Sequence, residues 1–188
     1  MTDEYSRDYR VYFAYGPDIN QKYIRSRCFG PEILAVARLS GYRLSFYGNS
    51  QIWDGAQETL ERSEGDEVWG VVYKMSFYDG YELDSYQDVR LDGAGPYFHY
   101  PVTVEGTDGQ MYYPLIYMKN LTGDEKPPSR EYMDVIIRGA EEMGLPPEYI
   151  KSLKKIETKS ASYAVPLPTM PRRTECSGCD DLLFKDTV

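Results

Sequence analysis

Histidine, cysteine and long hydrophobic runs are scarce in this sequence. His99 is the only histidine and there are three cysteines among 188 residues. A cysteine–histidine catalytic pair would have to join Cys28 to His99, and we expect Cys28 to be an inert thiol instead. Cys176 and Cys179 have the spacing of two metal ligands, but zinc takes four. No metal site is therefore expected within one chain, and a metal bridging two chains stays open.

Membrane-spanning segments and excess basic charge are also missing. No hydrophobic run approaches the roughly 20 residues that cross a membrane, and the polar N-terminus is unlike a secretory signal. We therefore expect a cytoplasmic protein. Lys and Arg total 21 against 30 Asp and Glu, a formal net charge of −9. Because phosphate binding needs clustered basic residues, no nucleic-acid partner is expected. Because no long hydrophobic run is present, no membrane partner is expected either. A homodimer stays open.

The composition is that of a globular protein, with 41% hydrophobic and 27% charged residues. Its length suits one domain with a substantial core. We place this domain at residues 1–158, followed by an irregular C-terminal tail at 159–188. The 19 tyrosines suit half-buried strands and polar pocket walls, because the ring is apolar and its tip is polar.

The order of the expected elements defines the fold class. Strands are expected at residues 9–15, 33–38, 42–47, 57–62, 67–75, 97–104 and 111–118, with a loop at 48–56 and a turn at 63–66. Helices are expected at 19–27, 77–89, 129–143 and 147–156, with Asp18, Ser76 and Ser129 as N-caps. This order predicts an α+β fold in which a mixed sheet curls into a small β-barrel with flanking helices.

One expected helix directs attention to position 87. Leu83, Tyr86 and Gln87 stand at i, i+3 and i+4, so they share a face, and Leu83 should turn that face inward. Gln87 is therefore expected to face the core or a cavity. The acidic residues Asp84, Asp88 and Asp92 recur every fourth residue and are expected to form a solvated face.

Motifs in one consistent order carry a family resemblance. The segments are YFAYG at residues 12–16, VAR at 36–38, GNS at 48–50, GDEVWGVVYKM at 65–75, LDSYQDV at 83–89, and GA, GLP, EY and LKKI between 139 and 156. Together they resemble the γ-glutamylcyclotransferase family, whose opening strand and bend are YFAYGSN and whose catalytic segment is LDxxEGV. The resemblance covers residues 12–156 and leaves the tail out.

This resemblance implies both the fold and a reaction. The fold is a small mixed β-barrel with flanking helices. The reaction converts a γ-glutamyl amine or peptide to 5-oxoproline and releases the amine, without a metal or organic cofactor. The implied partner is thus a small-molecule γ-glutamyl or amine ligand. The implied substrate-binding residues are Tyr15, Gly16, Pro17, Asp18, Ile19 and Tyr86, and the implied position of the general base is 87.

The sequence departs from the family pattern at two points of the implied site. The family glutamate aligns with Gln87, whose amide cannot accept a proton near neutral pH. The YGSN bend has become Tyr15-Gly16-Pro17-Asp18, and proline lacks an N–H donor. Asp18 adds a negative charge, which favours an amine-bearing or cationic ligand.

Three explanations follow from these departures. Gln87 could be a substitution introduced to trap a substrate, although Pro17 and Asp18 would then be unneeded. Alternatively, Glu58 could be a relocated base, because it stands on a strand where the family has a small residue, as in GxATI. An exposed strand position for Glu58 is the competing interpretation. Finally, the chain could be an inactive family member that binds a γ-glutamyl or amine ligand without turnover.

Overall fold

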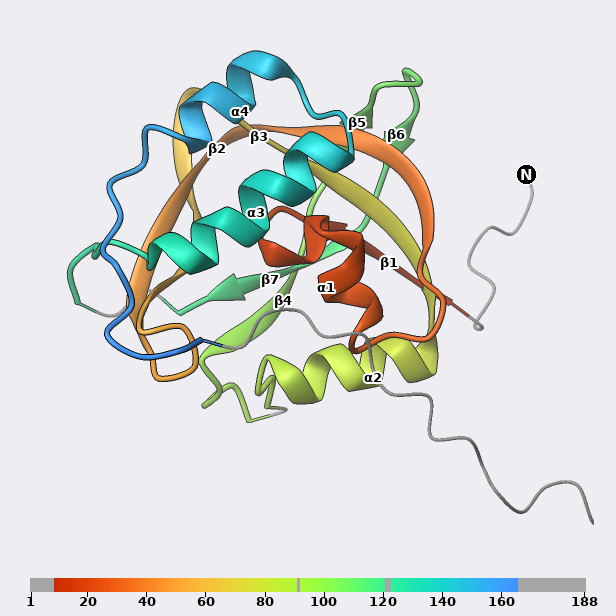
Figure 1. Ribbon diagram of the computed structural model, residues 1–188. Helices are drawn as coiled ribbons and strands as arrows, with labels where there is room; N and C mark the ends of the chain where they lie inside the picture. Colours follow the sequence, from red (N-terminus) through yellow and green to blue (C-terminus); the bar gives the residue numbers. More distant parts are fainter. Residues whose placement is uncertain (1–8, 91, 121–122, 166–188) are drawn as a thin grey trace, which may run out of the picture.

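The protein is seen here as a computed structural model, which describes residues 9–90, 92–120 and 123–165. Within them, seven strands form one sheet in the order β4-β7-β1-β3-β2-β5-β6 (Figure 1). β1 and β7 run parallel, whereas the other neighbouring strands are antiparallel. The sheet is therefore mixed, and it curls into a half-barrel. The predicted fold class is confirmed.

The helices and strands have the following bounds. The strands are β1 (Tyr9–Ala14), β2 (Glu32–Ser50), β3 (Gly55–Ser76), β4 (Tyr97–Pro101), β5 (Val104–Gly106), β6 (Met111–Tyr112) and β7 (Leu115–Lys119). The helices are a 3-10 turn, η1 (Pro17–Ile19), and α1 (Gln21–Arg25), α2 (Phe77–Tyr86), α3 (Arg130–Glu142) and α4 (Pro147–Leu153).

β2 and β3 are each longer than the sequence predicts. The expected strands at 33–38 and 42–47 are one strand, and those at 57–62 and 67–75 are another. The two long strands pair as an antiparallel ribbon whose ladder passes directly from Ser40↔Glu67 to Tyr42↔Arg62. The expected turn at 63–66 therefore interrupts the ladder without ending the strand, so the ribbon continues through it.

Two of the three predicted N-caps are confirmed. Ser76 accepts a hydrogen bond from the backbone N–H of Asp79, and Ser129 from that of Tyr132. The third prediction is wrong, because α1 is capped by Asn20, whose side chain accepts from two backbone N–H groups of the first turn. Asp18 lies in the preceding 3-10 turn and is buried, so its carboxylate does not cap α1.

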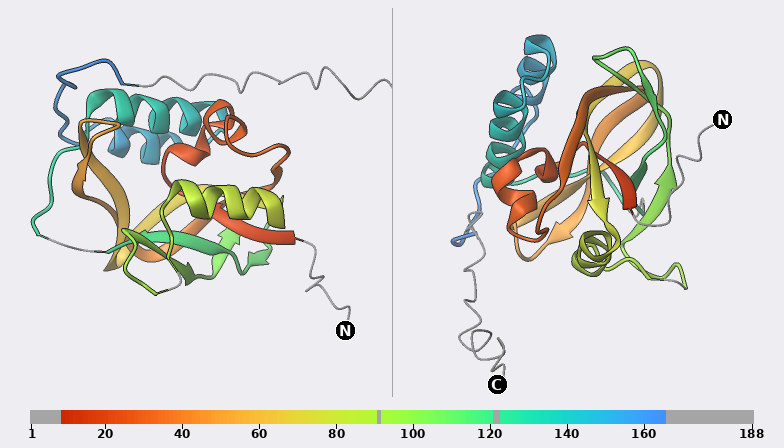
Figure 2. Two further views of the ribbon diagram at one scale, coloured as in Figure 1. Left: turned by 90° about the horizontal axis from the view of Figure 1, so that it is seen from below. Right: turned by 90° about the vertical axis from the view of Figure 1, so that its right-hand side faces the viewer.

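The helices pack against the curled sheet and enclose the larger part of the core. Figure 2 shows α3 and α4 together with α1 on one side of the sheet, while α2 lies along another edge. One buried cluster includes Ile19, Trp53, Leu83 and Ile136, and joins the helices to the sheet. A second lies within the sheet itself and includes Phe13, Leu60, Val68, Val72 and Ile116.

A charged network fixes α2 to the sheet. The Asp84 carboxylate accepts hydrogen bonds from Arg10 at 2.7 and 3.1 Å, and from the Tyr117 hydroxyl at 2.6 Å. His99 Nε2 lies 2.7 Å from the same carboxylate. The expectation that Asp84 belongs to a solvated acidic face is therefore wrong. These hydrogen bonds hold the pKa of Asp84 well below its ordinary value, although partial burial opposes them.

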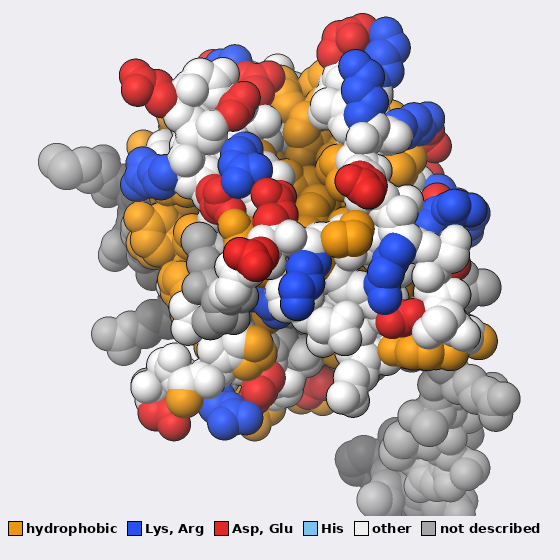
Figure 3. All heavy atoms as spheres, turned by 90° about the vertical axis from the view of Figure 1, so that its left-hand side faces the viewer, with side chains coloured by type: hydrophobic (Ala, Val, Ile, Leu, Met, Phe, Trp, Pro, Cys, Tyr) orange, Lys and Arg blue, Asp and Glu red, His pale blue; other side chains and the backbone are white. Residues whose placement is uncertain are grey.

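The described surface carries charges of both signs. On the face shown in Figure 3, Lys and Arg side chains alternate with Asp and Glu around a hollow in which hydrophobic side chains are visible. Among the described helices, none is long and apolar enough to span a membrane. The described tail residues 159–165 form no helix and pack back through Ser162, whose N–H and hydroxyl bind Asp54.

We expect Asp84→Asn to lower the free energy of unfolding by about 1–3 kcal/mol, because it removes the charged acceptor shared by Arg10, His99 and Tyr117. A lowered pKa stabilises the fold above the ordinary carboxyl pKa, and this stability is lost as pH falls below about 4. Urea unfolding at pH 7 and pH 3 should therefore show a smaller difference between variant and wild type at pH 3. The exposed Asp88→Asn is the matched control, and an equal loss in both variants would contradict the assignment.

Candidate active site

Glu58 is a buried carboxyl group that packs against the bend after β1. It stands on β3 and its exposed fraction is 6%. A Cβ placed on Gly16 would overlap the Glu58 carboxyl group, and its Cγ would lie 2.8 Å away. The absence of a side chain at Gly16 therefore makes room for this carboxyl group. The competing interpretation, that Glu58 is an exposed strand residue, does not agree with this burial.

The surroundings of Glu58 raise its pKa to about 7. Burial is the largest cause, and the negative charge of Asp18 adds to it. A hydrogen bond donated by the Tyr132 hydroxyl and the positive charge of Lys119 act in the opposite direction. At neutral pH this carboxyl group is thus poised between its protonated and ionised forms, which is the condition for transferring protons in both directions.

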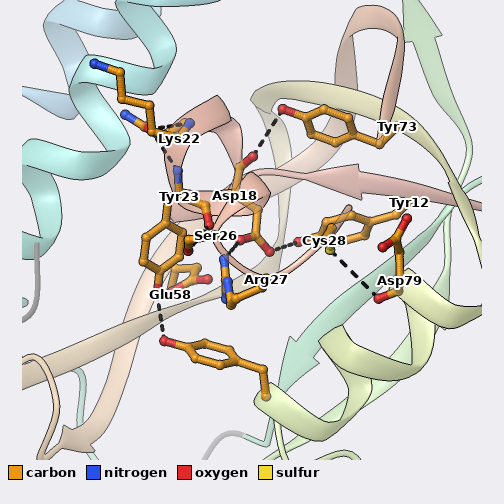
Figure 4. A network of polar contacts seen from close by, with 12 residues as sticks. Tyr12, Asp18, Lys22, Tyr23, Ser26, Arg27, Cys28, Glu58, Tyr73 and Asp79 are labelled. Atoms are coloured by element: carbon orange, nitrogen blue, oxygen red, sulfur yellow. Dashed lines mark hydrogen bonds and ion pairs between the residues drawn. The ribbon is translucent and has the colours of Figure 1, made fainter. Parts of the chain in front are cut away.

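The bend itself is held by hydrogen bonds and an ion pair. The Gly16 carbonyl accepts from the Ile19 N–H at 3.1 Å, which closes the 3-10 turn. The Asp18 carboxylate pairs with the Arg27 guanidinium and accepts from the Tyr12 hydroxyl at 2.9 Å (Figure 4). Both Asp18 oxygens therefore have partners within the chain, and a cationic ligand would have to compete with Arg27.

Arg27 lies between two tyrosine rings. The centre of its guanidinium is 4.0 Å from the centroid of the Tyr23 ring and 4.1 Å from that of Tyr86. The two tyrosine hydroxyls are 2.8 Å apart and share a hydrogen bond. Since Tyr23 stands on α1 and Tyr86 ends α2, this stack joins the two helices beside the bend. The positive charge of Arg27 is balanced by the Asp18 carboxylate.

Gln87 occupies the C-cap of α2 and is buried, with an exposed fraction of 7%. Its N–H donates to the Leu83 carbonyl at 2.9 Å, and Leu83 is fully buried. The expected inward orientation thus agrees with the burial of Leu83 and Gln87. It is wrong for Tyr86, which is 42% exposed because its ring lies over Arg27 near the surface.

The structure brings only some of the predicted site residues into contact. Gly16 and Glu58 touch, and Asp18 lies close enough to influence the Glu58 pKa. Tyr15 is buried and its hydroxyl donates to the Tyr117 carbonyl, so its side chain supports the bend rather than facing a ligand. Ile19 is completely buried in the core. Pro17 begins the 3-10 turn, where its missing N–H leaves no helical hydrogen bond unmade.

Sequence patterns did not identify three residues that surround Glu58 or the bend. Tyr132 falls on the apolar stripe of the predicted helix 129–143, where nothing distinguishes a reaching hydroxyl from a packed ring. Arg27 ends a predicted helix and looks like an ordinary basic C-terminal residue. Lys119 follows a predicted strand. A signal was available only for Tyr132, because a buried tyrosine hydroxyl needs a polar partner.

The described residues offer neither a metal centre nor a reactive thiol. They contain no group of three or more His, Cys, Asp or Glu side chains placed to hold a metal. Burial raises the pKa of the Cys28 thiol to about 12, and its sulfur contacts the Asp79 carbonyl. His99 is engaged with Asp84 instead. Cys176 and Cys179 lie outside the described residues.

Comparisons with known proteins agree with this fold. A model of the AIG2-like family matches residues 67–153. The γ-glutamylcyclotransferase of Bos taurus is 39% identical over 153 residues, and that of Homo sapiens is 38% identical over 152 residues. In both cases 78% of each chain is covered. A solved γ-glutamyl cyclotransferase superposes with a TM-score of 0.78 at 35% identity, covering 84% of this chain and 94% of that one.

The mixed half-barrel and the match over residues 67–153 make the chain similar to the AIG2-like proteins. The chain belongs to the γ-glutamylcyclotransferase family.

We expect the buried Glu58 to make stability depend on pH. Its pKa in the folded state, about 7, exceeds its ordinary value of 4.5. The folded protein therefore binds more protons than the unfolded chain between these values. Stability should fall as pH rises through this window, by about 3 kcal/mol in total. Urea titrations from pH 4.5 to 8 should show this decrease in wild type and a flatter curve for Glu58→Gln; parallel curves would contradict the shifted pKa.

Proposed function

We propose that the protein is a γ-glutamylcyclotransferase that converts a γ-glutamyl amine or peptide to 5-oxoproline, with Glu58 as the proton-transferring residue. The single observation behind this proposal is the buried Glu58 carboxyl group packed against the Gly16 bend with a pKa near neutrality. Membership of the γ-glutamylcyclotransferase family supports the reaction class. The assignment to Glu58 rests on this chain's own geometry.

The reaction needs one group that first accepts and then donates a proton. The α-amine of the glutamyl moiety attacks its own γ-carbonyl carbon, and a ring nitrogen–carbon bond forms. The bond from that carbon to the leaving nitrogen then breaks. The attacking amine loses a proton to the Glu58 carboxylate, and Glu58 returns it to the leaving nitrogen. No water, metal or redox partner is consumed, so atoms and charge balance between one substrate and two products.

The pKa of Glu58 suits this double role. An acid–base catalyst works best when its pKa lies near the operating pH, because both forms are then available. An exposed glutamate with its ordinary pKa would be a weaker base towards the attacking amine, and almost none of it would carry a proton at neutral pH. Burial beneath the bend, together with the nearby Asp18 charge, provides the increase. The Tyr132 hydroxyl holds one Glu58 oxygen in place and leaves the other facing Gly16.

Positioning supplies the other part of the proposed catalysis. Attack within one molecule requires a folded-back conformer, and holding that conformer removes much of the entropic barrier. The 3-10 turn and the Asp18–Arg27 ion pair fix the bend on which the glutamyl moiety would lie. The Tyr23–Arg27–Tyr86 stack fixes the adjoining helix ends. A rigid bend of this kind fits a substrate that must be held in one conformation.

A second function is ligand binding without turnover. The observation that favours it is the amide of Gln87, which occupies the position implied for the family base and cannot accept a proton at neutral pH. Under this alternative Glu58 only helps to bind a γ-glutamyl or amine ligand. A substitution at position 87 made to trap substrate would give the same behaviour. The two functions differ in whether 5-oxoproline is released.

We expect Glu58→Gln to lower the rate of 5-oxoproline release by about 10²–10⁴-fold, the usual cost of losing a general acid–base. The wild-type rate should rise with pH through about 7 as Glu58 ionises, and Glu58→Gln should lose this rise. Chromatographic quantification of 5-oxoproline from a panel of γ-glutamyl substrates provides the measurement. Glu64→Gln, an exposed position on the same strand, is the matched control and should retain the wild-type rate.

The variant Gln87→Glu separates the two functions. If Glu58 is the base, wild type is active and Gln87→Glu adds little. Release of 5-oxoproline by Gln87→Glu alone would show a disarmed cyclotransferase whose ligand is bound without turnover. Activity of wild type that persists unchanged in Glu58→Gln would remove Glu58 from the proposed role.

A further inference from the structure

Lys119 is a cation that lies close enough to Glu58 to influence its pKa. It ends β7, where it pairs with Tyr97 of β4, and its ammonium group lies 4.5 Å from the centroid of the Tyr97 ring. Gly48 adjoins the same side chain, since a Cβ at that position would lie 3.1 Å from Lys119 Cε and 3.7 Å from Nζ. The Tyr97 ring and Gly48 therefore both restrict the conformation of the Lys119 side chain.

Hydrogen bonds connect both Lys119 and Tyr97 to the segment of β3 that carries Glu58. The Thr59 hydroxyl and the Lys119 backbone bind each other, with distances of 3.0 Å from the Lys119 N–H and 3.3 Å to its carbonyl. The Tyr97 hydroxyl donates to the Glu58 carbonyl at 3.3 Å. The Lys119 backbone is thus hydrogen-bonded to Thr59, the residue after Glu58 on β3. The Tyr97 side chain is hydrogen-bonded to the backbone of Glu58 itself.

The Lys119 ammonium group has no carboxylate partner in the described part of the chain. Each ion pair between described residues uses another cation, and the nearby Arg27 is balanced by Asp18. Lys119 is half-buried, and burial lowers its pKa. Withdrawing an ammonium group from water without a counterion is unfavourable. When Glu58 is protonated, the Lys119 ammonium group therefore has no negative charge among the described residues to pair with.

We infer that Lys119 binds a carboxylate group of the substrate and so determines which γ-glutamyl compounds are accepted. This inference rests on the proposed function for the identity of the ligand. The expectation that the bound group is anionic rests on the unpaired ammonium group of Lys119. An ammonium group suits this task, because it offers N–H donors to a carboxylate from a confined position. Glu58 and Lys119 then have separate duties: Glu58 moves the proton, and Lys119 holds the anionic end.

The carboxylate could come from either half of the substrate. The glutamyl half carries an α-carboxylate, and a leaving amino acid carries a second one. Both present the same chemistry to Lys119. Three matched compounds distinguish them: γ-glutamyl-alanine with both groups, γ-glutamyl-ethylamine without the carboxylate of the leaving half, and γ-glutamyl-alanine whose glutamyl α-carboxylate is an amide.

The test compares kcat/KM for these compounds in wild type, Lys119→Met, Lys119→Arg and the exposed control Lys155→Met. We expect Lys119→Met to lower kcat/KM for γ-glutamyl-alanine by about 10–100-fold, the loss expected for a hydrogen bond to a charged group. Lys119→Arg should retain most of the activity because the charge remains. Because the Lys119 charge also lowers the pKa of Glu58, Lys119→Met affects all three compounds to some extent. The fall in kcat/KM should be clearly smallest for the compound that lacks the recognised carboxylate, and this compound identifies the source.

An equal fall for all three compounds, or no fall for any, would overturn the inference. Thermal unfolding of Lys119→Met confirms that the variant is folded. If wild type releases no 5-oxoproline from any compound, the proposed function fails, but recognition can still be measured by calorimetric binding of the same compounds to wild type and Lys119→Met. Binding that weakens only when the carboxylate is present would support the inference without turnover. Equal binding to both proteins, or none to wild type, would reject it.

Discussion

The close packing of the Glu58 carboxyl group against Gly16 is the contact on which the site depends. Any side chain at Gly16 would occupy the volume of this carboxyl group. Position 16 therefore has to lack a side chain for Glu58 to be buried in this way. Burial is the main cause of the raised pKa of Glu58. One backbone position thus makes room for the carboxyl group and, through burial, influences its pKa. The Tyr132 hydroxyl then limits the carboxyl group to one orientation.

Two carboxyl groups lie near this bend and their partners make them different. Asp18 has a guanidinium group, the Tyr12 hydroxyl and a fixed turn around it. Glu58 has a phenol and a more distant ammonium group. An ion pair favours the charged form of an acid, whereas burial with a neutral partner favours the protonated form. The negative charge of Asp18 also opposes ionisation of Glu58. In the proposed function, Asp18 would thereby help Glu58 to keep a proton without transferring one itself.

Local signals predicted the elements that depend on local physics. The cap at Ser129, the apolar stripe that follows it and the cap at Ser76 are all set within one helical turn, and each is present. The inward position of Gln87 follows from helical spacing in the same way. The fold class followed from the order of strands and helices, together with the family resemblance.

The remaining features depend on residues far apart in the chain, which periodicity cannot pair. The β2–β3 ribbon continues through residues 63–66 because its two strands support each other across the ladder. Asp84 has the spacing of a solvated residue, yet Arg10 and Tyr117 approach it from β1 and β7. Asp18 likewise resembles a cap until Arg27 folds back on it. A charged side chain alone does not reveal which distant partner will neutralise it.

The location of Gln87 bears on the proposal that an acid on β3 replaces one on α2. Position 87 is the C-cap of α2, where the partial negative charge of the helix end disfavours a carboxylate. A glutamate there, as the family resemblance implies, would have a raised pKa caused by the helix. The pKa of Glu58 is raised instead by burial and the Asp18 charge. The proposed reaction requires a raised pKa and access to the bend. Under that proposal, β3 would provide the proton-transferring group that the family resemblance implies for α2.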